Sequence, residues 1–170
     1  MPAICMQGKN YMEGKIRMKI GIIVYSETGN TIFVAERLKE NFIKEKYEVD
    51  IKAIEKLDSA IKDPNKIIIK DIPDLDCYDV LIFGAPVHGF TLAPAFKAYL
   101  KKLPSIKEKI VYCYVTKALP TKRFGGLKAI KIMEESILSY GGMLKKTAII
   151  NWKKHQTQIP NLIEEFLNIL

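Results

Sequence analysis

Short apolar runs alternate with amphipathic stretches along most of this chain. Residues 19–25 (KIGIIVY) and 79–84 (DVLIFG) are almost wholly apolar, and polar segments that favour turns bound them. Such runs are typical of strands whose two faces are both buried. Residues 31–44 instead repeat their apolar side chains at the spacing of one helix face and carry charges on the other side. The pattern therefore predicts strands and helices in alternation.

Five strands and four long helices follow from this pattern. The predicted strands are residues 19–25, 47–54, 79–84, 109–115 and 143–152. The predicted helices are residues 31–44, 93–103, 126–140 and 160–170. Between the second and third strands, the chain suggests a short helix over residues 56–61 and an irregular or edge strand over residues 66–72. Alternation of this kind favours an α/β fold with a mostly parallel, doubly wound sheet and helices on both faces.

The first residues of the chain differ from the rest. Residues 1–17 mix polar and apolar side chains without a sustained period, and a strong apolar strand opens at Met18. We expect residues 1–17 to be an N-terminal extension, disordered or leader-like, and residues 18–170 to form a single domain. No signal peptide is evident, and no stretch approaches the roughly 20 apolar residues of a membrane-spanning helix.

Composition narrows the class of protein further. The chain is 48% hydrophobic and 27% charged, the balance of an ordinary globular protein. Its three cysteines, Cys5, Cys77 and Cys113, form no CxxC pair, which offers no support for a zinc or iron–sulfur site. Scattered thiols fit a reducing compartment, and we expect a cytoplasmic protein.

The chain is strongly basic, with a net charge of +8 and a pI near 9.3. One interpretation is a solvated basic surface that favours solubility, and the other is attraction to acidic partners or polyanions. The lysines are spread along the chain, which favours the first interpretation. No aromatic–basic stripe or nucleic-acid-binding motif is present, so we expect no specific nucleic acid as a partner.

The segment between the first strand and the first helix is rich in hydrogen-bond donors. It consists of Ser26, Glu27, Thr28, Gly29, Asn30 and Thr31. Backbone N–H groups at a helix N-terminus lack partners and can bind a phosphate, and hydroxyl groups and a flexible glycine add to such a site. The loop contains no Lys or Arg and matches neither the Walker A nor the Rossmann glycine pattern. An ordinary helix cap is the alternative, but the position after the first strand favours phosphate binding.

Residues 26–31 match the phosphate-loop pattern of the flavodoxins, (Ser/Thr)-x-Thr-Gly-x-Thr, at every specified position. The order of strands and helices also resembles that of flavodoxins over about residues 18–170. This resemblance implies a flavodoxin-like, doubly wound, five-stranded parallel sheet in the order 2-1-3-4-5, with helices on both faces. It further implies FMN as the cofactor, bound across the carboxyl ends of the strands with its phosphate on residues 26–31.

The resemblance also assigns a role to the loop after the third strand, residues 85–91. In flavodoxin-like proteins this loop lies against the flavin ring. The residues implied as flavin contacts are Pro86, Val87, His88, Gly89 and Phe90. The peptide at Gly89 can flip, so that a carbonyl meets the protonated N5 atom of the reduced flavin and stabilises the half-reduced state. His88 and Phe90 could stack on the ring; alternatively, Phe90 packs under the next helix and His88 faces solvent.

A third loop, residues 116–126, follows the fourth strand, and its counterpart in flavodoxins closes over the other side of the flavin. The residues implied as contacts are Thr116, Lys117, Ala118, Leu119, Phe124 and Gly125. Many flavodoxins carry an aromatic and several acidic residues in this loop, whereas this chain has Lys117, Lys122 and Arg123. Either Leu119 or Phe124 could cover the ring, and a solvated basic loop is the alternative.

The remaining candidate residues point to no other chemistry. Trp152 and His155 follow the fifth strand, and we interpret Trp152 as a packing residue. Paired carboxylates, a Ser-His-Asp set or a histidine cluster are not recognisable in the sequence, so hydrolase chemistry has no support. We therefore predict no catalytic and no metal-binding residue.

Together these patterns favour an FMN-binding electron-transfer protein that shuttles electrons between redox partners, since no long insertion is apparent that could build a deep substrate pocket. The basic charge favours acidic partners, for example acidic ferredoxins or reductases. The first alternative is an FMN-dependent NAD(P)H, quinone or protoporphyrinogen-type oxidoreductase on the same fold, so enzymatic activity stays open. The second is a basic binding module without flavin.

Overall fold

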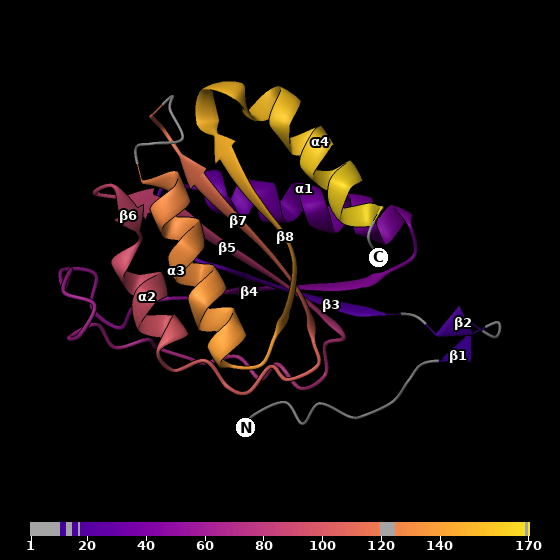
Figure 1. Cartoon of the computed structure of the whole chain (residues 1–170), viewed down its shortest axis with the longest axis horizontal. Coiled ribbons are helices and arrows are strands. Elements are labelled where there is room, and N and C mark those ends of the chain that lie inside the picture. Colours follow the sequence, from indigo (N-terminus) through magenta and orange to yellow (C-terminus); the bar gives the residue numbers. More distant parts are fainter. Residues whose placement is uncertain (1–10, 13–14, 17, 120–124, 169) are drawn as a thin grey trace.

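The computed structural model describes residues 11–12, 15–16, 18–119, 125–168 and 170 (Figure 1). Five parallel strands form its main sheet. They are β3 (Lys19–Val24), β4 (Glu48–Ala53), β5 (Val80–His88), β7 (Ile110–Lys117) and β8 (Met143–Asn151). Their order across the sheet is β4-β3-β5-β7-β8, and a short strand, β6 (Thr91–Leu92), pairs antiparallel with β5. The predicted parallel sheet with the order 2-1-3-4-5 is therefore confirmed.

Helices cover both faces of this sheet (Figure 1). They are α1 (Asn30–Lys44), α2 (Pro94–Leu100), α3 (Gly126–Ser139) and α4 (His155–Leu167), with a short 3₁₀ helix, η1 (Trp152–Lys154), before α4. On one face α2 and α3 bury Phe96 and Met133 against the sheet. On the other face α1 and α4 bury Phe42 and Phe166. The molecule is thus a doubly wound α/β fold, as predicted.

Both faces of the central strands are buried, which explains why the sequence shows them as unbroken apolar runs. In β3, Ile22 and Val24 enter the core beneath α1 and α4, whereas Ile23 enters the core beneath α2 and α3. In β5, Ile82 and Phe83 divide in the same way. Neighbouring side chains of a strand point to opposite faces, so a sheet covered on both sides needs apolar residues at every position.

The last helix begins earlier than its sequence suggests. The prediction started it at Pro160, but it begins at His155 and ends at Leu167, with Pro160 inside it. The side chain of Asn151 accepts a hydrogen bond from the Lys153 N–H (3.0 Å) and starts the turn of η1, which leads directly into α4. A proline is favoured in the first turn of a helix but does not by itself mark the start, and that prediction was wrong.

The connection from β4 to β5, residues 54–79, contains no helix. The short helix predicted for residues 56–61 is absent. The Asp58 carboxylate accepts a hydrogen bond from the Ala60 N–H (2.8 Å), and such local bonds favour turns over helix. The strand predicted for residues 66–72 is reduced to one antiparallel bridge, between Lys56 and Ile69.

This irregular segment nevertheless packs firmly against the sheet. Ile67, Ile69 and Leu75 are at most 5% exposed and belong to the same core as α2 and α3. The segment therefore takes the place of a crossover helix, and its first part lies at the carboxyl edge of the sheet, where the Lys56 ammonium comes within 3.8 Å of Glu27.

Within the predicted extension of residues 1–17, two short strands are described. β1 (Tyr11–Met12) and β2 (Lys15–Ile16) pair antiparallel as a separate two-stranded sheet. The rest of the predicted extension lies outside the described residues, and its separation from the domain stays a prediction. In the part of the chain that the structure describes, no helix has the length and apolar character needed to cross a membrane.

Candidate functional site

Three loops of the chain meet at one edge of the sheet. They follow β3, β5 and β7, which are parallel neighbours, so their carboxyl ends lie side by side (Figure 1). In doubly wound sheets, ligands bind in the crevice outside this edge. The predicted site residues therefore come together from distant parts of the chain.

The first loop, residues 26–31, leads into α1 without a side-chain cap. Gly29 is the N-cap, with a φ of 87°, and no side chain caps the helix. A Cβ atom at Gly29 would meet no other atom within 4 Å, so the backbone here lies open. The alternative of an ordinary Ser, Thr or Asn cap is therefore wrong. The free N–H groups at the start of α1 are suited to an anion.

Two hydroxyl groups of the first loop have different surroundings. The Ser26 Oγ atom is buried and has no hydrogen-bond partner among the described residues. A buried hydroxyl without a partner costs roughly 1–3 kcal/mol, so this atom fits a site that an acceptor such as a phosphate oxygen completes. The Thr31 Oγ1 atom, by contrast, lies 2.7 Å from Thr116 Oγ1, and both residues are buried. Thr31 thus joins the first loop to the end of β7. Thr28 is exposed.

Tyr114 on β7 fixes the start of α1 from within the core. Its buried hydroxyl donates a hydrogen bond to the carbonyl oxygen of Thr31 (2.9 Å). The Tyr114 ring crosses the neighbouring strand at Gly84, where a Cβ atom would lie 2.2 Å from the ring carbon Cζ. Any side chain at Gly84 would displace the ring. Sequence reasoning missed this contact, because nothing local connects a strand glycine with a tyrosine thirty residues later.

The carboxylate of Glu27 is held by groups from three parts of the chain. Its Oε1 atom accepts a hydrogen bond from the Tyr25 hydroxyl and lies 3.8 Å from Lys56 Nζ, and its Oε2 atom lies 3.7 Å from His88 Nε2. The hydrogen bond from Tyr25 lowers the pKa of Glu27, against the opposing effect of burial, and the nearby positive charges lower it further. The carboxylate that would repel a phosphate therefore faces Tyr25, Lys56 and His88.

The second loop is shorter than predicted, because β5 continues through Pro86, Val87 and His88. Only Gly89 and Phe90 form the turn of the β5–β6 hairpin, with φ angles of 51° and 62°. Positive φ at both positions is what a tight, type I′ hairpin turn requires. Phe90 is 58% exposed and does not pack under the next helix, and the His88 side chain is 32% exposed.

The third loop starts with two buried side chains. Thr116 and Lys117 are the last residues of β7 and are 3% and 5% exposed, whereas the next two residues, Ala118 and Leu119, are exposed. Burial lowers the pKa of Lys117. Phe124 lies outside the described residues, so the choice between Leu119 and Phe124 as the cover of the ring stays a prediction.

The third loop ends at Gly125, which is the N-cap of α3 and has a φ of 82°. A Cβ atom here would lie 2.4 Å from the carbonyl carbon of Phe90. Glycine is therefore needed both for the backbone conformation and for the close approach of the hairpin to α3. The structure gives Gly125 this packing role, and its predicted contact with a flavin stays a prediction.

The three loops are joined in pairs by these contacts. The first loop contacts the hairpin through Glu27 and the third loop through Thr31, and the hairpin meets the third loop at Gly125. The loops thus form one connected rim at the edge of the sheet. A cofactor bound at this rim would contact three loops that hold one another in place.

Asn151, which sequence reasoning did not single out, holds the third loop against the end of β8. It is 6% exposed, and its Nδ2 atom donates a hydrogen bond to the Leu119 carbonyl (2.9 Å). The signal in the sequence that could have identified Asn151 is a polar residue at the end of an apolar strand (AIIN). The next residue, Trp152, stacks on His155 with 4.3 Å between ring centroids and meets Phe33 edge-on at 5.8 Å. These ring contacts agree with its interpretation as a packing residue.

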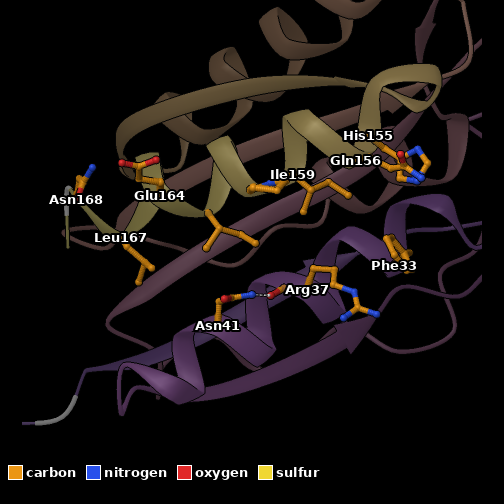
Figure 2. Close-up of a pocket in the computed structure, with 11 residues that line it drawn as sticks. Phe33, Arg37, Asn41, His155, Gln156, Ile159, Glu164, Leu167 and Asn168 are labelled. Atoms are coloured by element: carbon orange, nitrogen blue, oxygen red, sulfur yellow. Dashed lines mark hydrogen bonds between the residues drawn. The ribbon is translucent and has the colours of Figure 1, made fainter.

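One cavity lies at this edge of the sheet, and a larger hollow lies along the helices that cover one face. The cavity, of about 450 Å³, is lined by Tyr25 and Glu27, by residues of the 54–79 segment and by His88. The larger hollow, of about 640 Å³, lies between α1 and α4, and Figure 2 shows Arg37 and Asn41 of α1 along one side and residues of α4 along the other. No cluster of three or more His, Cys, Asp or Glu side chains that could hold a metal occurs in the described part of the chain.

No protein-family model matches the chain, and no curated protein matches it in sequence. Among solved structures, a flavodoxin from Streptococcus pneumoniae matches with a TM-score of 0.65 at 14% identity, over 89% of this chain and 99% of that chain. Flavodoxin 2 from Bacillus cereus matches with a TM-score of 0.64 at 20% identity, over 87% of this chain and 94% of that chain.

A third structure is a Fusobacterium nucleatum flavodoxin variant bound to flavin mononucleotide. It matches with a TM-score of 0.61 at 16% identity, over 89% of this chain and 94% of that chain. Identities this low establish a likeness of fold. The resemblance first seen in residues 26–31 is thus confirmed for the architecture as a whole: this chain has the flavodoxin-like fold.

Proposed function

We propose that this protein binds FMN at the rim of three loops and transfers electrons between redox partners. One observation carries the proposal: α1 begins without a side-chain cap, next to a buried Ser26 hydroxyl that has no partner among the described residues. Neutral N–H and O–H donors at a helix N-terminus suit a phosphate group. The Fusobacterium nucleatum flavodoxin variant, which shares this fold and is bound to flavin mononucleotide, supports FMN as the ligand.

FMN supplies one-electron and two-electron redox chemistry when it is bound, and the residues of the chain bind and orient it. Ser26, Thr28 and the N–H groups at the start of α1 would hold the phosphate. Residues 87–90 of the hairpin and residues 116–119 of the third loop would flank the ring. The contact between Gly125 and the hairpin backbone keeps these two flanks in a fixed relation.

Exposed apolar side chains at the rim favour a carrier over an enzyme with a closed site. Phe90 is 58% exposed and Leu119 is 47% exposed, at the tip of the hairpin and in the third loop. Transfer of electrons to another protein requires a ring edge that a partner can approach, and such residues suit a docking surface. With a net charge of +8, the partners would be acidic redox proteins such as ferredoxins or reductases. The buried Cys113, which forms no disulfide among the described residues, favours the reducing cytoplasm as the compartment.

An FMN-dependent oxidoreductase that acts on a small molecule is the second candidate. It is favoured by the cavity of about 450 Å³ that the irregular 54–79 segment helps to line beside His88. Oxidation of NADPH, or reduction of a quinone by NADPH, in the presence of the FMN-loaded protein alone would favour the enzyme. Absence of both activities, with electron transfer to a ferredoxin, would favour the carrier.

The role of the first loop is tested by a fluorescence titration with FMN, whose emission is quenched when a protein binds it. We expect Ser26→Ala to weaken FMN binding by about tenfold or more, since a hydrogen bond to a charged group contributes roughly 1.5–3 kcal/mol. Ser105→Ala, at an exposed serine that precedes β7 and so lies at the opposite end of that strand from the third loop, is the matched control and should bind as the unmodified chain does. Equal affinity for both variants would remove Ser26 from the site.

A further inference from the structure

The cavity of about 450 Å³ lies beside the hairpin, on the side of β3 and β4. Its walls come from the end of β3, the first loop, residues 56–67 and the start of α2. No described residue of β7 or of the third loop lines it. The cavity is therefore distinct from the space between the hairpin and the third loop, where the flavin ring is proposed to lie.

One part of the cavity wall is apolar. Ile61 and Ile67 belong to the irregular segment of residues 54–79. They line the cavity together with Pro94 and Ala95 at the start of α2. Ile67 and Ala95 are 5% and 1% exposed, so this wall is part of the packed core. The apolar part of a small ligand, whether planar or aliphatic, would pack against this wall.

The polar part of the wall carries an excess of positive charge. Lys56 donates a hydrogen bond to the Ser59 carbonyl (3.1 Å) and lies 3.8 Å from Glu27, whose carboxylate also faces Tyr25 and His88. Lys62 is exposed at the cavity, and its charge helps to lower the pKa of Glu27, but it forms no hydrogen bond or ion pair within the described ranges. The Glu27 carboxylate is thus contacted by Tyr25, Lys56 and His88, and Lys62, which makes no direct contact with it, adds a further positive charge at the cavity.

We propose that this cavity binds a small organic anion with an apolar body, and that Lys62 recognises its negative group. The apolar part of the ligand would pack against Ile61, Ile67 and Ala95. Its negative group would lie near the ammonium groups of Lys62 and Lys56. The inference goes beyond FMN binding and does not depend on it. His88 belongs both to this cavity and to the hairpin proposed to flank the flavin, so the bound anion would lie next to the redox site.

The experiment uses naphthalenesulfonate, a planar aromatic anion that flavins do not reduce, and measures its binding by calorimetry to the full chain with and without FMN. We expect one site, an affinity that falls with added salt, and a loss of about tenfold in Lys62→Gln, because a charge-assisted contact is removed. Lys66→Gln is the matched control, since Lys66 is an exposed lysine of the same segment that does not line the cavity. It should change the affinity by less than about twofold.

Backbone NMR shifts locate the probe in the same titration. Shifts that gather at Lys62, His88 and Ala95 support the proposal. Equal affinities of Lys62→Gln and Lys66→Gln would overturn it, and so would shifts confined to the hollow between α1 and α4. Displacement of the probe by FMN would also overturn it, because the cavity would then be part of the flavin site. A chain that fails to bind FMN but binds the probe at Lys62 would refute the proposed function and leave this inference standing.

Discussion

Glu27 occupies an unspecified position of the phosphate-loop pattern, yet its carboxylate faces Tyr25, Lys56 and His88 from three segments of the chain. The sequence could show that an acid lies within a loop suited to phosphate, but it could not show where that acid points. The direction depends on His88 at the end of a strand and on Lys56 in a segment whose fold the sequence did not reveal. The hydroxyl donors of the loop, by contrast, were predictable, because their chemistry is local.

At the residue scale, we expect Glu27→Gln to destabilise the fold at neutral pH but not in acid. The pKa of Glu27 is lowered from its ordinary value of 4.5, chiefly because Tyr25 donates a hydrogen bond to the charged form. A carboxyl group with a lowered pKa stabilises the folded state above its ordinary pKa, and this contribution is lost as the pH falls through the folded-state value. Urea unfolding at pH about 7 and at pH about 3 measures the difference between the two proteins.

Glu36→Gln, at an exposed glutamate of α1, is the control for the loss of a carboxylate. If Glu27→Gln were less stable than the unmodified chain by the same amount at both pH values, the Tyr25–Glu27 contact would not be the source of the effect.

At the scale of elements, prediction succeeded for the parallel strands and failed for the segment between β4 and β5. β3 and β5 are covered on both faces, so their sequences are continuous apolar runs, which are typical of buried parallel strands. Residues 54–79 are fixed by scattered core residues such as Leu75 and by turns such as the one at Asp58, and neither produces a helical or alternating pattern. The contact between the hairpin and α3 was equally hidden, because it is made by backbone atoms of Phe90 and by the absence of a side chain at Gly125.

Gly125→Ala tests that contact between elements. The positive φ alone should cost about 1–2 kcal/mol, and the approach of the new Cβ to within 2.4 Å of the Phe90 backbone should add about 1–3 kcal/mol. Gly29→Ala shares the positive φ but meets no atom within 4 Å, so it should show only the first of these costs. Denaturant unfolding compares the two variants. Equal losses of stability would mean that the hairpin does not rest on α3 in solution.

At the scale of the whole molecule, the chain is strongly basic, with a pI near 9.3. A net charge of +8 should attract an acidic redox protein over distances of about 10 Å at moderate ionic strength. We expect the rate of association of the FMN-loaded protein with an acidic ferredoxin to fall as salt is raised, in stopped-flow measurements. A rate that rises with salt would exclude electrostatic docking of this kind.

The most direct measurement of the central claim is the visible absorption spectrum of the protein after incubation with FMN and removal of the unbound flavin. The uncapped start of α1 and the unpartnered Ser26 hydroxyl predict that flavin absorption stays with the protein. They also predict that Ser26→Ala retains less flavin than Ser105→Ala does under the same washing. A folded protein that shows no flavin absorption after this treatment would contradict the account.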